Sequence, residues 1–253
     1  MVHYFEYNGI NSREMGVYIR TKQVYDKPQR DISIISVPGR DGDLVIDNGS
    51  YKNLEMTLGL RLVAPRISKN NVDSFNWAYN NVVEWLQPTA NYCVYSDSYD
   101  PRYYRKACIK SALKITQKCN DIADFNVTFS MKPYKYSLEG DEVIELSGGA
   151  NFTVVNLENA PSLPKMTIYN NLTYDAAAEI THVFAVNNTN YTIKNFNSPI
   201  ELDTETMNLY QGTTNRNNLY LSSSFPVLKP GLNTVTLVSN VSKIQIIPRW
   251  RAL

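Results

Sequence analysis

Two strand-like stretches are joined by Val37-Pro38-Gly39-Arg40-Asp41-Gly42-Asp43-Leu44. Gly39 and Gly42 accept positive φ, and Pro38 fixes its own φ and disfavours helix at the residue before it. The segment therefore predicts a turn rich in Gly and Asp. The stretch before it, 32–37, carries apolar residues at both odd and even positions. This strand is therefore predicted to be apolar on both faces for part of its length.

The clearest strand lies downstream of this turn, at 54–63. Its even positions carry only Leu and Met, and its odd positions are mostly polar. Period-2 alternation over five repeats predicts a strand that covers a core on one side only.

A single helix is predicted at about 70–86. Apolar residues recur there at helical spacing, among them Phe75, Val82 and Leu86, with Trp77 and Trp85 nearby. Candidate caps are Ser68, Asn70 and Asn71, and Pro88 is predicted to end the helix. The Trp and Phe side chains are expected to pack onto a sheet.

The rest of the chain reads as β structure. Strands are predicted at 92–96, 103–115 and 125–136, and the pattern breaks at 137–141. We therefore predict two domains, 1–140 and 141–253. The second half shows short strands separated by turns rich in Asn, Asp, Gly and Pro, at 143–146, 152–155, 166–169, 180–186, 191–194, 200–203, 209–210, 219–221, 234–238 and 244–247. The predicted fold class is mainly β: an N-terminal β-sandwich or barrel-like domain with one α-helix, and a C-terminal antiparallel β-sandwich.

Composition excludes several classes of function. The 253 residues hold 25 basic and 24 acidic side chains, a formal charge of +1, and show no basic stripe. A main role in nucleic-acid binding is therefore not expected. No signal peptide and no apolar run of about 20 residues is present, so neither secretion by that route nor membrane insertion is expected.

Metal and cofactor sites are not expected either. The two histidines, His3 and His182, are far apart, which disfavours a zinc site and a His-based triad. The three cysteines, Cys93, Cys108 and Cys119, form no Cys-x-x-Cys motif and are expected to be reduced and buried.

One pair of carboxylates deserves a catalytic hypothesis. Glu201 and Asp203 are two apart on a predicted strand and therefore share a face. A hydrolase could use such a pair, but the sequence supplies no nucleophile or base beside it. Solvated strand ends commonly carry the same pattern.

Taken together, several motifs resemble the distal tail protein (Dit) family of siphophages that infect Gram-positive bacteria. The turn at 38–42 is followed by Tyr51 and by one helix. Later come Ile200-x-Leu202-Asp203-Thr204-Glu205, then Phe225-Pro226-x-Leu228-x-Pro230-Gly231-x-Asn233, and Arg249 near the end. The resemblance covers essentially the whole chain. It is greatest to the Dit of a lactococcal temperate siphophage.

This resemblance implies a structural part of the virion with no catalytic site and no cofactor, made in the host cytoplasm and located at the distal end of the tail. It implies a homo-hexameric ring, single or stacked in pairs, with a channel for DNA. The ring would join the major tail protein to the tail-associated lysin or fibre and to an upper baseplate protein. The C-terminal domain would be a galectin-like sandwich. We place the subunit or tube contacts in the 38–51 region, at Arg40, Asp41 and Tyr51.

A second hypothesis comes from the C-terminal sandwich itself. Trp250 and the many tyrosines could stack on sugars, which predicts a carbohydrate-binding protein that recognises host cell-wall polysaccharide. The alternative for Trp250 is a closing strand whose indole plugs one end of the sandwich.

Overall fold

The computed structural model describes residues 3–21, 27–66, 71–87, 90–170, 172, 179–197 and 199–253. The chain forms two compact units, Met1–Lys135 with Leu253, and Tyr136–Ala252. The split falls within strand β10 (Ile122–Ser137). The division into domains 1–140 and 141–253 stays a prediction.

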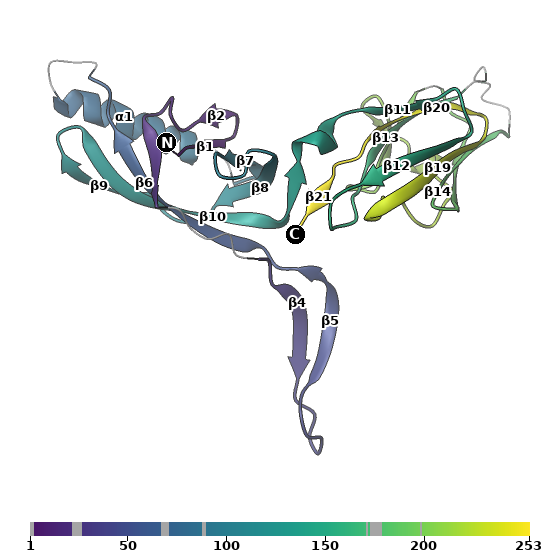
Figure 1. Cartoon of the computed structure of the whole chain (residues 1–253), viewed down its shortest axis with the longest axis horizontal. Helices are drawn as coiled ribbons and strands as arrows, with labels where there is room; N and C mark the ends of the chain where they lie inside the picture. The colour runs from purple at the N-terminus through teal and green to yellow at the C-terminus, as the bar shows by residue number, and fades with distance from the viewer. Residues whose placement is uncertain are drawn as a thin grey trace. The chain divides into compact units, whose positions relative to one another are not determined.

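The first unit is built on one curled antiparallel sheet (Figure 1). Its strands pair in the order β2-β1-β7-β8-β10-β6-β3, and β9 also pairs with β10. Their bounds are β1 (Phe5–Tyr7), β2 (Ile10–Asn11), β3 (Val17–Thr21), β6 (Leu54–Val63), β7 (Cys93–Asp97), β8 (Tyr103–Ile109) and β9 (Lys114–Cys119).

The core of this unit lies between the sheet and helix α1 (Asn71–Leu86). Strand β6 buries alternate residues, as the sequence predicts, and pairs with β10 so that Leu60 is opposite Phe125. The helix contributes Val82 and Trp85 to the same core. The predicted cap residues Ser68 and Asn70 and the predicted stop at Pro88 lie outside the described residues.

Strands β4 (Arg30–Ile35) and β5 (Leu44–Tyr51) form a separate two-stranded hairpin (Figure 1). The turn predicted at 37–44 is confirmed, with Gly39 and Gly42 at φ 78° and 83°. The strand before the turn is apolar on both faces, as predicted, since Ile34 and Ile35 lie on opposite sides of the ribbon. Ile34 is 61% exposed, because β4 pairs only with β5 among the described strands.

The second unit is an antiparallel β-sandwich. One sheet has the order β11-β20-β13-β16-β17-β18 and the other the order β12-β19-β14-β15. Buried side chains from both sheets form one core, for example Met166 and Ile246 from the first and Phe184 and Val235 from the second. The bounds are β11 (Ile144–Ser147), β12 (Asn151–Asn156), β13 (Lys165–Asn170), β14 (Thr181–Val186), β15 (Thr189–Lys194), β16 (Ile200–Asp203), β17 (Asn208–Gln211), β18 (Thr214–Asn215), β19 (Gly231–Ser239) and β20 (Val241–Ile247). The mainly β class with one helix is thus confirmed.

Two predicted strands are wrong. The strand expected at 103–115 is two strands, since Lys110 bonds to Thr128 while Lys114 pairs with Asn126, so the residues between them bulge out. The strand expected at 219–221 is the end of a short 3₁₀ helix, Asn217–Leu219, followed by a single bridge from Tyr220 to Ile193.

The end of the chain closes the second unit. Trp250 is 8% exposed and belongs to its core, and strand β21 (Arg251–Ala252) follows. The backbone N–H of Ser137 donates to the Trp250 carbonyl, and that of Arg249 donates to the Gly140 carbonyl. A Cβ at Gly140 would lie 2.3 Å from the Trp250 nitrogen, so only glycine fits there.

The described part of the chain has no helix long and apolar enough to cross a membrane. It also has no group of three His, Cys, Asp or Glu side chains placed to hold a metal ion. No disulfide joins the three cysteines. Cys119 is exposed, so the prediction of buried thiols is wrong at that position.

Candidate interaction surface

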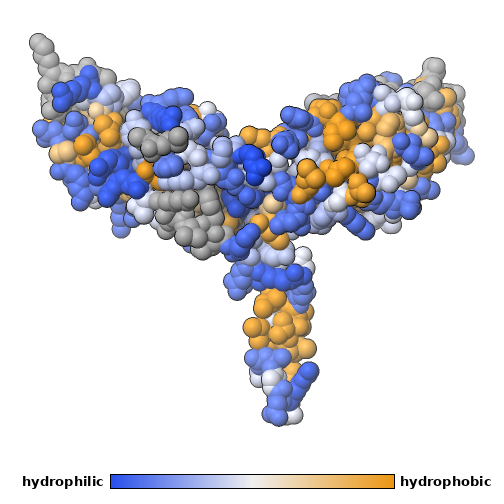
Figure 2. All heavy atoms as spheres, viewed as in Figure 1, coloured by the Kyte–Doolittle hydropathy of each residue, from blue (hydrophilic) through white to orange (hydrophobic). Residues whose placement is uncertain are grey.

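The β4–β5 hairpin carries the largest run of exposed apolar side chains in the first unit. Cross-strand pairs place Ile34 opposite Val45 and Ile35 opposite Leu44. Because side chains alternate along a strand, these two pairs face opposite sides of the ribbon. Figure 2 shows the hydrophobic surface along the hairpin.

Both faces of the hairpin are exposed to solvent. On one face Ile34 and Val45 are 61% and 59% exposed. On the other, Ile35, Leu44 and Ile46 are each about two-fifths exposed. Contiguous exposed apolar surface on a soluble protein marks an interaction site. The hairpin is therefore the best candidate for a surface that a partner covers.

Charged groups hold the base of the hairpin. The Arg30 guanidinium donates to the Asp47 carboxylate and lies 5.6 Å from the Tyr51 ring. Hydrogen bonds from Arg30 and from the backbone of Gly49 hold the pKa of Asp47 below its ordinary value. Lys52 pairs with Asp31 at 3.8 Å. Since these groups are solvated, the pairs join the two strands at the base but contribute little to stability.

The three residues predicted to make contacts lie on this hairpin but not together. Arg40 and Asp41 are in the exposed turn at its tip, and Tyr51 is at its base. Tyr51 contacts β10 of the main sheet through Tyr134, with the two ring centroids 6.1 Å apart. The apolar pairs between tip and base were not predicted as a contact surface, although the apolar residues at consecutive positions of 32–37 were their signal.

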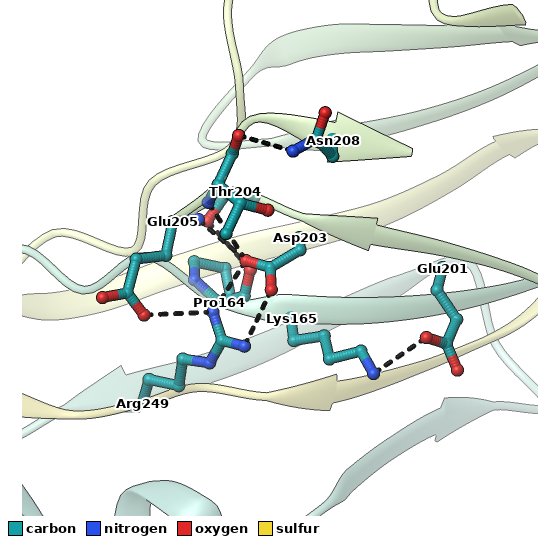
Figure 3. A network of polar contacts seen from close by, with 9 residues as sticks. Pro164, Lys165, Glu201, Asp203, Thr204, Glu205, Asn208 and Arg249 are labelled. Atoms are coloured by element: carbon teal, nitrogen blue, oxygen red, sulfur yellow. Dashed lines mark hydrogen bonds and ion pairs between the residues drawn. The ribbon is translucent and has the colours of Figure 1, made fainter. Parts of the chain in front are cut away.

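The carboxylates proposed for a hydrolase are both engaged in ion pairs (Figure 3). Glu201 pairs with Lys165 at 2.8 Å. Asp203 receives two hydrogen bonds from Arg249, at 2.8 and 3.0 Å, and Glu205 lies 3.5 Å from the same guanidinium. A catalytic carboxylate must be open to substrate, so this arrangement supports a structural role.

The Asp203–Arg249 pair joins two of the motifs on which the resemblance rests. Burial acts to raise the pKa of Asp203. The Arg249 guanidinium and the backbone N–H groups of Glu205 and Thr206 outweigh burial and hold the pKa below its usual range. The pair ties β16 to the segment after β20, and so fastens the end of the chain to the sandwich.

We expect Asp203→Asn to lower the free energy of unfolding by about 2–3 kcal/mol at pH 7, because it weakens charge-assisted hydrogen bonds to a half-buried arginine. The folded-state pKa of Asp203 is depressed. Its stabilisation is therefore present above the unfolded pKa of about 3.9 and is lost as pH falls through the folded value. Urea unfolding at pH 7 and at about pH 3 should show the difference between variant and wild type shrinking in acid.

Glu201→Gln is the matched control for that measurement. Glu201 makes a single ion pair, with Lys165, and this pair is more exposed than that of Asp203. Its loss should therefore cost less than about 1 kcal/mol. Equal losses for the two variants would contradict the role assigned to Asp203.

Asn233 explains the second C-terminal motif. Its side chain is fully buried, accepts from the Lys229 N–H and donates to the Lys229 carbonyl. Asn187 donates to the same Asn233 oxygen at 2.8 Å. The Pro-Gly-x-Asn sequence is therefore a turn closed by a buried amide, and the motif is structural.

No protein-family model matches the sequence, and no curated protein matches it. A solved structure does share the fold. It is the Dit protein of phage SPP1, described as a paradigm of the hub adsorption apparatus in phages that infect Gram-positive bacteria. The TM-score is 0.73 at 13% sequence identity, over 97% of this chain and 98% of that one.

Proposed function

We propose that this protein is a structural hub of a phage tail tip or baseplate and forms a hexameric ring with a channel for DNA. The observation that carries the proposal is the hairpin with exposed apolar side chains on both faces, in a chain that shares the fold of a tail hub protein along nearly its whole length.

The physical argument starts from the stability of the hairpin. An isolated two-stranded hairpin is at best marginally stable in water. Six of the exposed large hydrophobic residues lie between Ile34 and Ile46, and burial of such groups is the main favourable term in association. A surface that covers them also orders the hairpin. A contact between the hairpin and a different surface of the neighbouring subunit is heterologous, and heterologous contacts close into a ring when the rotation per subunit closes.

In this proposal residues 1–140 form the ring and residues 141–253 form the outer, galectin-like domain. The ring joins the major tail protein to the tail-associated lysin or fibre, and the outer domain attaches an upper baseplate protein. The protein acts at the distal end of the tail and has no catalytic role. We also propose that, within the Dit family, the protein is most similar to the Dit of a lactococcal temperate siphophage.

We expect charge reversal at the hairpin tip, Arg40→Glu, to weaken ring assembly or attachment to the tail tube about tenfold, as reversal of an interface charge commonly does. Arg40 is exposed, so the melting temperature should stay unchanged. Arg66→Glu, an exposed arginine in the same unit, is the control. If Arg40→Glu assembles and joins the tail as the wild type does, the tip is not part of the contact surface.

Labelling of virions tests the location. An antibody against this chain, detected with gold in the electron microscope, should mark the end of the tail distal to the capsid. Label on the capsid, or along the tail tube, would contradict the proposed function.

The position of Trp250 does not support the carbohydrate hypothesis. Trp250 is buried in the core of the sandwich, so its ring offers no open platform for a sugar. This agrees with the alternative in which the indole plugs one end of the unit.

A further inference from the structure

Strand β12 is an unprotected edge of the four-stranded sheet in the second unit. Among the described strands it pairs only with β19. The Leu237 N–H donates to the Ala150 carbonyl, and the register pairs Thr153 with Thr234. Because hydrogen-bonded and non-hydrogen-bonded pairs alternate in an antiparallel ladder, the backbone groups of Asn151, Thr153 and Val155 point to the open edge.

The hydrogen bonds that β19 makes on its other side agree with this alternation. The Thr234 N–H and carbonyl bond to Asn187, on the side of β14. They are therefore turned away from β12. The open edge offers three N–H donors and three carbonyl acceptors in a row, the pattern that an added strand requires.

The other edges of the sandwich carry devices that discourage such pairing. At β15, Thr192 bonds to Leu221 and Ser222, so this edge is covered. β11 carries Glu145, whose pairs with Gln245 and Lys243 hold a charge there. β18 has only two residues. Natural edges are blunted by charge, proline, shortness or cover.

β12 has none of these devices. Asn151–Asn156 contains no charged residue and no proline, and its neighbour Gly231–Ser239 also contains none. Beside the edge lie three exposed apolar side chains on one face. Val155 is 44%, Leu157 87% and Leu232 76% exposed. Figure 2 shows a hydrophobic patch where Figure 1 draws β12 and β19. Because β12 and β19 carry no charged residue, a charged segment would find no partner there, and an uncharged segment fits this edge better.

We propose that β12 docks an extended, uncharged segment of a different protein, which adds to the sheet as a fifth strand and covers Val155, Leu157 and Leu232. This inference rests on the proposed function. In a six-fold ring neighbouring copies are related by one sixth of a turn and not by a two-fold axis, so the ring contact does not pair two β12 edges, and pairing between two stacked rings is the outcome that the mass measurement below distinguishes. The occupant is therefore another tail component and not a second copy of this chain.

Hydrogen exchange measured by mass spectrometry tests the docking. The two samples are the free full-length protein and the same chain in tail tips released from virions. We expect a peptide covering residues 150–157 to exchange roughly tenfold or more slowly in the tail tips, because its outward amides gain partners. Residues 181–186 of β14, already paired on both sides, are the internal reference.

Each outcome decides between separate claims. If the chain is present in the tail tips and the 150–157 amides exchange as in the free protein, the docking inference is wrong and the hub function stands. If the chain is absent from the tail tips, both fail. Slow exchange already in the free protein, together with a mass of twice the ring, would identify a second copy as the occupant and overturn the inference.

A variant pair isolates the backbone contact. Thr153→Pro removes an N–H that faces the open edge, a position at which an edge strand accepts proline. Thr153→Val keeps that N–H. We expect Thr153→Pro to reduce the exchange protection and the amount of the docked component in tail tips at least about tenfold. Thr153→Val should keep the exchange protection and the docked component. The mass of the ring should be unchanged in both variants.

A second substitution guards against a folding defect in the proline variant. Val155→Lys leaves the backbone intact and adds a charge beside the edge, the usual device against strand addition. It should reduce docking as well. Full docking by both Thr153→Pro and Val155→Lys would overturn the inference.

Discussion

Ile34→Asp should abolish ring assembly while leaving the fold of the subunit intact. Ile34 is 61% exposed in the subunit, and the proposed ring buries it. A carboxylate there is solvated in the free chain, so stability should change by less than about 0.5 kcal/mol. In the assembled state the same charge would be desolvated without a partner, which costs at least several kcal/mol. We expect the concentration needed for assembly to rise about a hundredfold or more.

Val72→Asp is the matched control for this change. Val72 is also 61% exposed but lies in the first turn of helix α1, away from the hairpin in sequence. The substitution introduces the same charge on an equally exposed apolar residue, at a helix N-terminus that tolerates it. Light scattering as a function of concentration should show intact rings for Val72→Asp only. Rings in both variants would exclude the hairpin from the subunit contact.

Trp85→Ala should lower the free energy of unfolding by about 3–5 kcal/mol, the largest stability loss that we expect in the first unit. Trp85 is 4% exposed, its ring stacks on Phe5 at 5.3 Å, and its indole N–H donates to the Tyr7 carbonyl at 2.9 Å. Truncation would leave a cavity between helix and sheet and remove the indole hydrogen bond that ties the helix to β1. Chemical denaturation followed by circular dichroism measures the loss.

The same helix supplies the control for that truncation. Trp77 is 50% exposed, so Trp77→Ala removes an equal side chain that is only about half buried. We expect a change of about 1 kcal/mol or less. Similar losses for the two variants would show that α1 packs on the sheet through a different face.

The regular elements were predictable because their side chains alternate against one core. Strand β6 has the bounds expected from its alternating sequence, and Phe125, Val127, Phe129 and Met131 on β10 are all buried. Helix α1 follows the apolar spacing of Phe75, Val82 and Trp85. In these segments local pattern and tertiary packing agree.

The exposure of the hairpin could not be predicted from the sequence, for a physical reason. An apolar pattern on both faces of a strand predicts burial, but it does not say whether the covering surface belongs to the same chain. Ile34, Ile35 and Val45 are exposed because nothing in the described part of this chain covers them. A bulge such as that after Lys110 escapes period-2 analysis as well, since the residues on both sides of it remain strand-like.

The predicted contact residues lie on the hairpin, but their role stays a prediction, and its exposed apolar pairs were not singled out. The motifs drew attention to Arg40 and Asp41 at the tip and Tyr51 at the base, whereas the apolar pairs between them form the continuous surface. The role of Asp203 could not be read from sequence spacing, because its partner Arg249 is 46 residues away.

The most direct test of the hub account is the mass of the purified full-length protein by light scattering after size exclusion, with negative-stain images of the main peak. The account predicts particles of six times the 28.8 kDa of one chain, or twice that for stacked rings, with a central hole. A monomer that persists at every concentration measured, with the hairpin exposed in solution, would contradict it.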